Sequence, residues 1–451
     1  MSADRPRQRA AAAAVLSAMA VVVLDAGMVG VALPTVAAAL GETPARTMAL
    51  VTAYQAALLI ALLPCAPIAE RFGYRRLFAG GLALFACASI VCAFAPTLEW
   101  LVAVRFLQGL GAAAIMSLGI ALLRFTLGPE RLGAAIGWNA LTVAICSAAA
   151  PALGAFLLSG ADWHWIFVAT APVAAVGLAA TRCLPHVART SRSLDLTGVA
   201  LHASAAGLVV VALALAPTET ALAAVLGTVA IVSAWRLITR ERGKTAPLVP
   251  FDLLALRPFR ASVAASIFFF TAQSAGLLAL PFYLQLGLGR SAAATGLTLA
   301  LWPAAVAATS RAANPLANRF APASICAAGG LLLAAGLVLG ASCPVGDSIA
   351  PLGACAIVCG VGFGLFQVPN NRTMFLSAPA ERSAAAGGMQ ATARLAGQTA
   401  GALLVGFVLS AAPAPTAPRL ALAAAALAAL VAAWISSAPL RSSGKAGRVG
   451  A

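Results

Sequence analysis

The chain alternates between long apolar runs and short polar segments. Lipid offers no hydrogen-bond partner to free backbone groups, so each membrane crossing takes ~20 helical residues. Fourteen runs reach that length, and the alternating pattern of a membrane β-barrel is not visible. We expect membrane helices at about 11–38, 47–69, 77–95, 100–123, 133–158, 164–182, 196–216, 220–237, 260–287, 292–315, 322–342, 349–371, 384–411 and 418–438.

Composition supports an all-α polytopic membrane protein. The 451 residues are 62% hydrophobic and only 9% charged, whereas soluble domains carry about 25% charged residues. The nine cysteines show no metal-ligand spacing, so we interpret them as small buried side chains and expect no metal or cofactor. No GxxxxGK[ST] motif is present, which argues against ATP as the energy source and against an enzyme.

Basic residues give the expected orientation. If both termini are cytoplasmic, 23 of the 29 Lys and Arg residues fall on the cytoplasmic side, as the positive-inside rule requires. The remaining six are Arg46, Arg290 and Arg419 in outer loops, and Arg105, Arg311 and Arg394 within spans. The net charge of +16 is therefore an orientation signal with some attraction to anionic lipid, and it predicts no nucleic-acid partner.

The chain contains an internal repeat. PIAERF at 67–72 returns as PLANRF at 315–320, and residues 129–159 align with 379–410. Two parallel six-helix halves of this kind enclose a polar cavity near the midplane and expose it alternately to each side. We expect a six-helix bundle at 1–190, two inserted helices with a cytoplasmic linker at 191–259, and a second six-helix bundle at 260–451.

Five stretches carry recognisable motifs. They are VLDAGMVGVALPTV at 23–36, APIAERFGYRR at 66–76, RFLQGLGAA at 105–113, APALGAF at 150–156 and WHWIFVATAP at 163–172. In order and spacing they resemble the major facilitator superfamily, in particular its fourteen-helix drug:proton antiporter group. The chain departs from that pattern at Gly30 and Thr170, where the group has Asn, at Glu70, where it has Asp, and at Ala66, Ala150 and Ala155, where it has Gly.

The turn after the second span is expected to act as a gate. Gly73 lets the chain bend, and the Glu70 carboxylate can pair with arginines when the two halves approach. In the second half the carboxylate is replaced by Asn318, so we expect an asymmetric latch; a loop that only holds helix ends is the alternative. The expected gate and hinge residues are Glu70, Arg71, Gly73, Arg75, Arg76, Arg131, Pro151, Gly154, Asn318 and Arg319.

Asp25 is the one acidic residue that we place within a span. A carboxylate there is costly and is functional by default. At ~1.5 Å per residue, Asp25 and Arg105 lie at similar depths in their helices. We therefore expect Asp25 to exchange a proton under the influence of Arg105, with a permanent structural salt bridge as the alternative.

Aromatic and amide side chains in the expected central helices are candidates for cargo binding. Arg394 lies near the middle of its span and either contacts cargo or bonds neighbouring carbonyl groups. The candidates are Tyr54, Gln55, Gln108, Asn139, Gln273, Tyr283, Gln285, Trp302, Gln367, Asn370 and Arg394.

Together these patterns, and the resemblance, predict a monomeric, proton-coupled exporter of small hydrophobic or cationic compounds in a bacterial-type inner membrane. Its expected partners are the small-molecule substrate, protons and membrane lipid. Two alternatives remain: a proton-coupled transporter of organic anions or polar metabolites, and a non-transporting sensor on the same fold.

Overall fold

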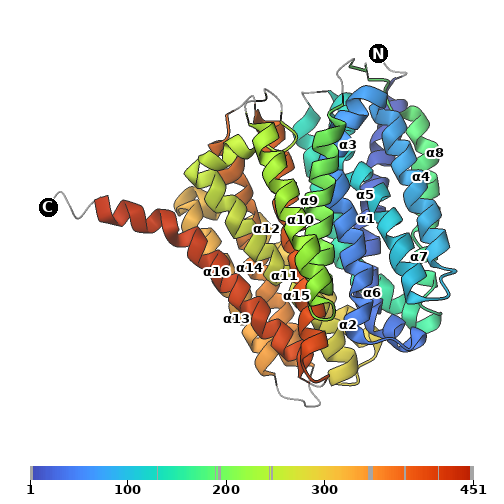
Figure 1. The fold of residues 1–451 in the computed structure, drawn as a ribbon, viewed down its shortest axis with the longest axis vertical. Helices are drawn as coiled ribbons and strands as arrows, with labels where there is room; N and C mark the ends of the chain where they lie inside the picture. Colours follow the sequence, from blue (N-terminus) through green and yellow to red (C-terminus); the bar gives the residue numbers. More distant parts are fainter. Residues whose placement is uncertain are drawn as a thin grey trace. The chain divides into compact units, whose positions relative to one another are not determined.

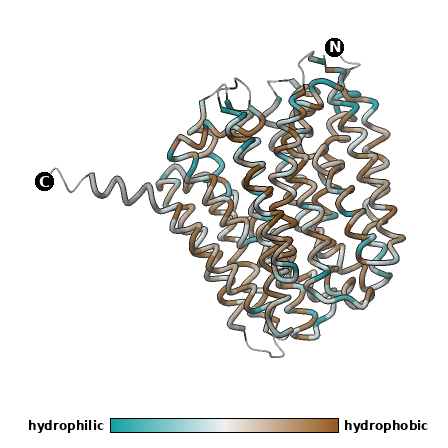
Figure 2. Tube along the Cα trace, in the orientation of Figure 1, coloured by the Kyte–Doolittle hydropathy of each residue, from teal (hydrophilic) through white to brown (hydrophobic). Residues whose placement is uncertain are grey.

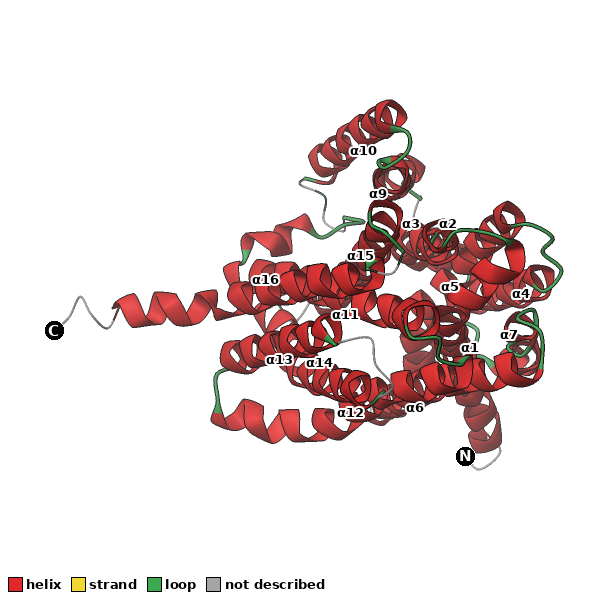
Figure 3. Ribbon diagram, turned by 90° about the horizontal axis from the view of Figure 1, so that it is seen from below, coloured by secondary structure: helices red, strands yellow, loops and turns green. Residues whose placement is uncertain are grey.

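The computed structural model is all-helical in the residues it describes, which are 4–128, 131–187, 189–190, 194–242, 244, 247–343, 349–379, 382–414 and 416–446. Its ribbon consists of helices and loops (Figure 3). Among the described residues, fourteen helices are long and apolar enough to cross a membrane, and hydrophobic positions run along most of them (Figure 2). The predicted fold class and number of spans are confirmed.

The chain divides into two compact units, Met1–Arg240 and Glu241–Ala451 (Figure 1). The helices of the first unit are α1 (Asp4–Leu40), α2 (Pro44–Thr47), α3 (Ala49–Phe72), α4 (Tyr74–Cys92), α5 (Leu98–Leu127), α6 (Leu132–Gly160), α7 (Trp165–Val168), α8 (Ala171–Ala180), η2 (Thr181–Cys183), α9 (Leu196–Leu215) and α10 (Thr220–Glu241). Those of the second are η3 (Phe251–Ala255), α11 (Arg257–Phe282), η4 (Tyr283–Gly287), α12 (Ala292–Arg319), α13 (Pro322–Ser342), α14 (Ala350–Ser377), α15 (Ser383–Ala411) and α16 (Ala417–Ala446).

The two inserted helices, α9 and α10, belong to the first unit. The buried His202 in α9 lies with its Nε2 3.2 Å from the carbonyl oxygen of Leu59 in α3. Asp195 caps the start of α9 through the Gly198 N–H at 2.9 Å, and it also accepts a hydrogen bond from Arg240 at 3.0 Å. These contacts hold α9 against α3 and tie its first turn to the end of α10.

The sixth span is interrupted rather than continuous. We expected one helix over 164–182, but α7 ends at Val168 and α8 begins at Ala171. Pro172 at the start of α8 has no N–H and cannot donate to the carbonyl group four residues earlier. The interruption therefore follows from Pro172, and it places Thr170 at the break.

Glycines in α5 allow it to pack closely against two neighbouring helices. A Cβ atom on Gly109 would lie 2.5 Å from the Tyr54 carbonyl oxygen of α3. One on Gly111 would lie 2.5 Å from the Gly81 carbonyl oxygen of α4. Because small residues let helix backbones approach within the membrane, the RFLQGLGAA motif fixes α5 against α3 and α4.

The second unit repeats these contacts. Gly360 in α14 packs on the Trp302 carbonyl oxygen of α12, and Gly362 packs on the Gly329 carbonyl oxygen of α13. Gly360 and Gly362 lie 251 residues after Gly109 and Gly111. The same offset relates residues 130–131 to residues 381–382 in the sequence repeat. The internal sequence repeat thus corresponds to a repeat of helix packing.

The APALGAF segment of α6 is packed against α1. A Cβ on Gly154 would lie 3.0 Å from the Met28 Cα, and one on Gly27 would lie 2.5 Å from the Ala150 Cβ. The small residues of this segment therefore bring α6 close to α1 beside Asp25.

We predict that Gly109→Ala destabilises the protein by about 1–3 kcal/mol, the usual cost of overpacking a tight contact. The new Cβ would meet a backbone atom that cannot move without shifting α3. The matched control is Gly80→Ala, at a position with open space around it, where loss of a helical glycine should be neutral or stabilising. Thermal unfolding of the purified variants in detergent measures both effects, and equal melting temperatures would contradict the packing argument.

Candidate functional site

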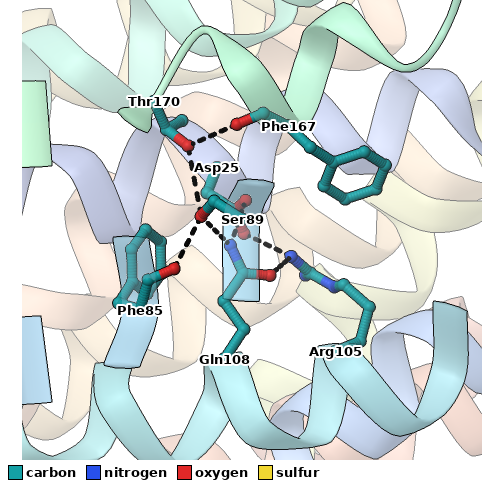
Figure 4. A network of polar contacts seen from close by, with 7 residues as sticks. All are labelled: Asp25, Phe85, Ser89, Arg105, Gln108, Phe167 and Thr170. Atoms are coloured by element: carbon teal, nitrogen blue, oxygen red, sulfur yellow. Dashed lines mark hydrogen bonds and ion pairs between the residues drawn. The ribbon is translucent and has the colours of Figure 1, made fainter. Parts of the chain in front are cut away.

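An ion pair between Asp25 and Arg105 lies at the centre of the candidate site (Figure 4). Asp25 in α1 is 0% exposed and Arg105 in α5 is 1% exposed. The Arg105 Nη1 donates to the Asp25 Oδ2 at 2.6 Å. The similar depths estimated from the sequence thus correspond to a direct contact, which links α1 to α5.

Gln108 connects both members of the pair. Its Oε1 accepts a hydrogen bond from the Arg105 Nη1 at 2.6 Å, and its Nε2 donates to the Asp25 Oδ1 at 3.0 Å. Gln108 is one turn from Arg105 on α5, and residues three apart in a helix share a face. Both carboxylate oxygens of Asp25 therefore have a donor.

The network continues to α4 and to the break in the sixth span. The Gln108 Nε2 also donates to the Ser89 Oγ at 2.7 Å, and Ser89 donates to the Phe85 carbonyl oxygen at 2.8 Å. The Thr170 Oγ1 lies 3.5 Å from the Ser89 Oγ and donates to the Phe167 carbonyl oxygen at 2.9 Å. Four membrane segments thus meet through polar side chains (Figure 4).

Two aromatic rings flank the Arg105 guanidinium. Its central carbon lies 4.3 Å from the Tyr54 ring centroid and 5.8 Å from that of Phe167. Such cation–π contacts stabilise a desolvated arginine. Among the described residues, the Arg105 Nε and the Tyr54 hydroxyl have no hydrogen-bond partner, so the site keeps unused hydrogen-bonding capacity.

The second unit has the same scaffold without the charges. A Cβ on Gly401 in α15 would lie 2.5 Å from the Thr271 carbonyl oxygen of α11, so α11 packs closely on α15 as α1 packs on α6. Arg105 and Gln108 correspond to Ala356 and Cys359. The Gln273 Oε1 is buried without a hydrogen-bond partner in the described part of the chain. The charged network is therefore a feature of the first unit.

The other predicted cargo residues occupy varied environments. The side-chain oxygens of Gln55 and Asn139 are buried and have no partner among the described residues. Asn370 donates to the Ser266 Oγ at 2.7 Å, and Tyr283 to the Cys343 carbonyl oxygen at 2.7 Å. Trp302 is buried, whereas Gln285 and Gln367 are half-buried.

Arg394 lies on a polar stripe of α15. It follows Gln390 by four residues and precedes Gly397 by three, so the three residues share one helix face. Gln390 donates to the Asn371 Oδ1 at 3.3 Å, and a Cβ on Gly397 would meet the Ile267 carbonyl oxygen of α11. Arg394 is half-buried and forms no ion pair with any described residue.

The expected gate turn is built around Gly73. Its φ of +104° lies in a region that favours glycine, and the chain passes there from α3 into α4. In the described residues, the Glu70 carboxylate forms no ion pair with Arg75, Arg76 or Arg131, so the expected pairing is not present. Instead, the Glu70 carbonyl oxygen accepts a hydrogen bond from the Thr190 N–H at 3.0 Å.

The remaining gate and hinge residues lie in different helices and differ in burial. Pro151 is buried within α6 next to the contact of Gly154 with α1. Arg71 is exposed, with its guanidinium 5.7 Å from the Phe72 ring centroid. In the second unit Arg319 is exposed, and the side chain of Asn318 lies outside the described residues. Their gating role stays a prediction.

Sequence reasoning missed Ser89, Phe167 and the 186–190 segment. Ser89 is one hydroxyl in an otherwise apolar span, and serine is frequent in such spans for packing alone. Thr170 stood out only as a departure from the family motif. Pairing between distant segments, such as Thr190 with Glu70, left no signal in the pattern of hydrophobic and polar positions.

The chain matches the sequence model of the Major Facilitator Superfamily over residues 15–402. Together with the helical bundle and the buried polar network, this match defines the class of protein: a multi-pass membrane transporter. The chain belongs to the Major Facilitator Superfamily.

Similar proteins are transporters and resistance proteins of bacteria. The transporter YebQ of Escherichia coli (strain K12) is 39% identical over 411 residues, covering 90% of this chain and 90% of its own length. The MdtD protein of Klebsiella pneumoniae (strain ATCC 700721 / MGH 78578), named for multidrug resistance, is 32% identical over 69% of this chain and 67% of its own. The tetracenomycin C resistance and export protein of Streptomyces glaucescens is 27% identical over 88% of this chain and 75% of its own.

Solved structures with the same fold include a POT family transporter. Its structure with 5-aminolevulinic acid superposes with a TM-score of 0.73, at 16% identity, over 95% of each chain. This likeness shows the fold alone. The family and the named relatives indicate a transporter, not an enzyme.

We predict that Arg105→Gln destabilises the protein by about 3–5 kcal/mol, because removing one partner leaves a buried carboxylate without its counterion. The double variant Asp25→Asn/Arg105→Gln should recover part of this loss. Thermal unfolding of the purified variants in detergent measures both differences.

The matched control is Arg46→Gln. Arg46 pairs with Glu42 at 2.7 Å, but its side chain is 55% exposed, and exposed pairs contribute little. If Arg105→Gln were no more destabilising than Arg46→Gln, the buried pair would not be a structural constraint.

Proposed function

We propose that this transporter is a proton-coupled exporter of small hydrophobic or cationic compounds that works by alternating access between its two six-helix halves. The observation that carries the proposal is the fully buried Asp25 carboxylate, paired with Arg105 within the span. Burial of an ionisable residue within a span is costly, so such a residue indicates a function.

Proton binding at Asp25 supplies a physical switch. A proton on the Asp25 Oδ2 removes the negative charge that Arg105 contacts at 2.6 Å. The guanidinium then keeps Gln108 and the Tyr54 ring as neighbours, but loses its counterion. Protonation thereby changes the balance of forces between α1 and α5, and a conformational change that follows it links proton flow to cargo movement.

Cargo contacts are proposed for the polar groups that retain unused hydrogen-bonding capacity. Buried polar groups in folded proteins normally have a partner. The unpartnered oxygens of Tyr54, Gln55, Asn139 and Gln273 therefore suit water or cargo bound during the cycle. Aromatic and amide groups of this kind accept varied amphipathic molecules, which fits the export and resistance functions named for MdtD and the tetracenomycin C protein.

The proposal also covers the membrane, the orientation, the oligomeric state and the moving parts of the transporter. We propose a bacterial-type inner membrane with cytoplasmic termini, an orientation that the distribution of basic residues supports. A monomer is sufficient, because both halves lie in one chain. The turn at Gly73 and the Gly154 contact with α1 are proposed to move during the cycle as gate and hinge.

A second candidate function, the export of organic anions, is favoured by Arg394. Asp25 is already neutralised by Arg105, whereas Arg394 is half-buried near the middle of its span without an ion pair in the described part of the chain. An arginine at such depth requires a polar partner. An anionic group on the cargo would supply one.

For proton coupling, we predict that Asp25→Asn abolishes accumulation driven by an imposed pH gradient in proteoliposomes. A cationic dye and an organic acid serve as cargo probes, and uptake into inverted vesicles is compared with protein-free liposomes. Glu42→Gln removes a carboxylate from the loop that follows α1 and should leave transport unchanged. Gradient-driven flux that survives in Asp25→Asn would remove Asp25 as the proton site.

For the charge of the cargo, we predict that Arg394→Gln raises the KM for an organic acid by roughly 10–100-fold if the cargo is anionic, the range expected for losing a hydrogen bond to a charged group. Transport of a cationic dye should then be unaffected. Arg372→Gln, at an exposed position of the same unit, is the control. An unchanged KM for every transported acid would eliminate the anion alternative.

A further inference from the structure

A basic pocket lies at the end of the first unit where α3 passes into α4. It has a volume of about 310 Å³ and is lined by Gly73, Tyr74, Arg75, Arg76, His186, Val187 and Arg189. This volume falls in the range of small-ligand sites, ~300–1,000 Å³. The pocket is separate from the network around Asp25, which the transport proposal uses.

Two contacts hold Arg189 and Thr190 against the turn. The Thr190 N–H donates to the Glu70 carbonyl oxygen at 3.0 Å, which fixes the segment to the last turn of α3. A Cβ on Gly73 would lie 3.5 Å from the Arg189 Nε. The guanidinium of Arg189 therefore lies directly against the glycine backbone, and residues more than 100 positions apart form one pocket.

The pocket concentrates positive charge without neutralising it. Arg75, Arg76 and Arg189 form no ion pair or hydrogen bond with any described residue. Glu70 is close to Tyr74 of the pocket, and its carboxylate forms no ion pair among the described residues. Three guanidinium groups around one cavity repel one another, so an anion bound between them would relieve an existing electrostatic cost.

The chemistry of the lining selects the kind of anion. A guanidinium group presents a planar fork of N–H donors that matches phosphate oxygens in a bidentate way. Val187 and the Tyr74 ring add apolar surface to the same wall, suited to carbon atoms attached to the phosphate. The helix end itself is a membrane surface in a chain of this type, and anionic phospholipids concentrate there.

We propose that this pocket binds the phosphate group of a phosphate ester, held by Arg75, Arg76 and Arg189. The headgroup of an anionic phospholipid and a soluble phosphate are the two possible sources. Occupancy ties Arg189 to the start of α4, and so makes the turn at Gly73 responsive to the surrounding lipid or to soluble phosphate. This site does not depend on proton coupling or on the nature of the cargo.

Native mass spectrometry of the full-length protein in detergent tests the proposal. Phosphatidylglycerol is titrated against phosphatidylcholine, and glycerol phosphate and inorganic phosphate are added as soluble competitors. We expect phosphatidylglycerol to bind the wild type in preference to phosphatidylcholine, and Arg75→Gln/Arg189→Gln to weaken this binding about tenfold or more. The matched control, Arg124→Gln/Arg236→Gln, removes two exposed arginines of the same unit outside the pocket and should retain wild-type affinity.

The arms of the experiment separate the outcomes. Displacement of the lipid by glycerol phosphate or inorganic phosphate at similar concentration identifies a soluble phosphate as a sufficient ligand, whereas resistance to both identifies the lipid. Equal binding of both lipids, or equal loss in the pocket and control variants, overturns the proposal. If the double variant fails to fold, the exposed Arg189→Gln is tested alone, and Arg189→Lys should restore part of the affinity.

Discussion

A charged side chain buried in the membrane needs a polar partner, because lipid cannot solvate it. This constraint is strongest at the Asp25–Arg105 pair. Neither side chain reaches solvent, so each depends on the other and on Gln108. That geometry requires α1, α4 and α5 to approach closely. Gly109 and Gly111 provide the approach of α5 to α3 and α4, and Gly27 that of α1 to α6. The small-residue motifs and the charged residues are thus two parts of one arrangement.

The internal repeat separates the scaffold from the chemistry. Both units keep the glycine contacts that set helix spacing, since Gly360 and Gly362 reproduce the packing of Gly109 and Gly111. The charges are not kept, because Ala356 stands where the first unit has Arg105. Packing is therefore common to the units, while the ionisable group is confined to one. Under the proposed function, the first unit senses the proton and the second supplies neutral polar groups and Arg394.

Much of this was accessible from the sequence, for physical reasons that also mark the limits. Lipid imposes a minimum length on apolar helices, so the fourteen spans could be counted, and helical rise placed Asp25 and Arg105 at similar depths. The break before Ala171 was missed because Pro172 lies within an otherwise apolar run. Ser89 was missed because a single hydroxyl group in an apolar span does not indicate which residue it contacts. Pairing of Glu70 with arginines when the two halves approach stays a prediction.

Under the proposed function, the surroundings of Arg105 let one pair serve both stability and switching. If the guanidinium depended on Asp25 alone, protonation would leave a bare cation in the membrane, and the neutral state would be inaccessible. Gln108 accepts from the same Nη1, and the Tyr54 ring lies 4.3 Å away, so Arg105 retains favourable contacts when the carboxyl group is neutral. In the proposed protonated state these neighbours continue to stabilise the guanidinium after Asp25 no longer does.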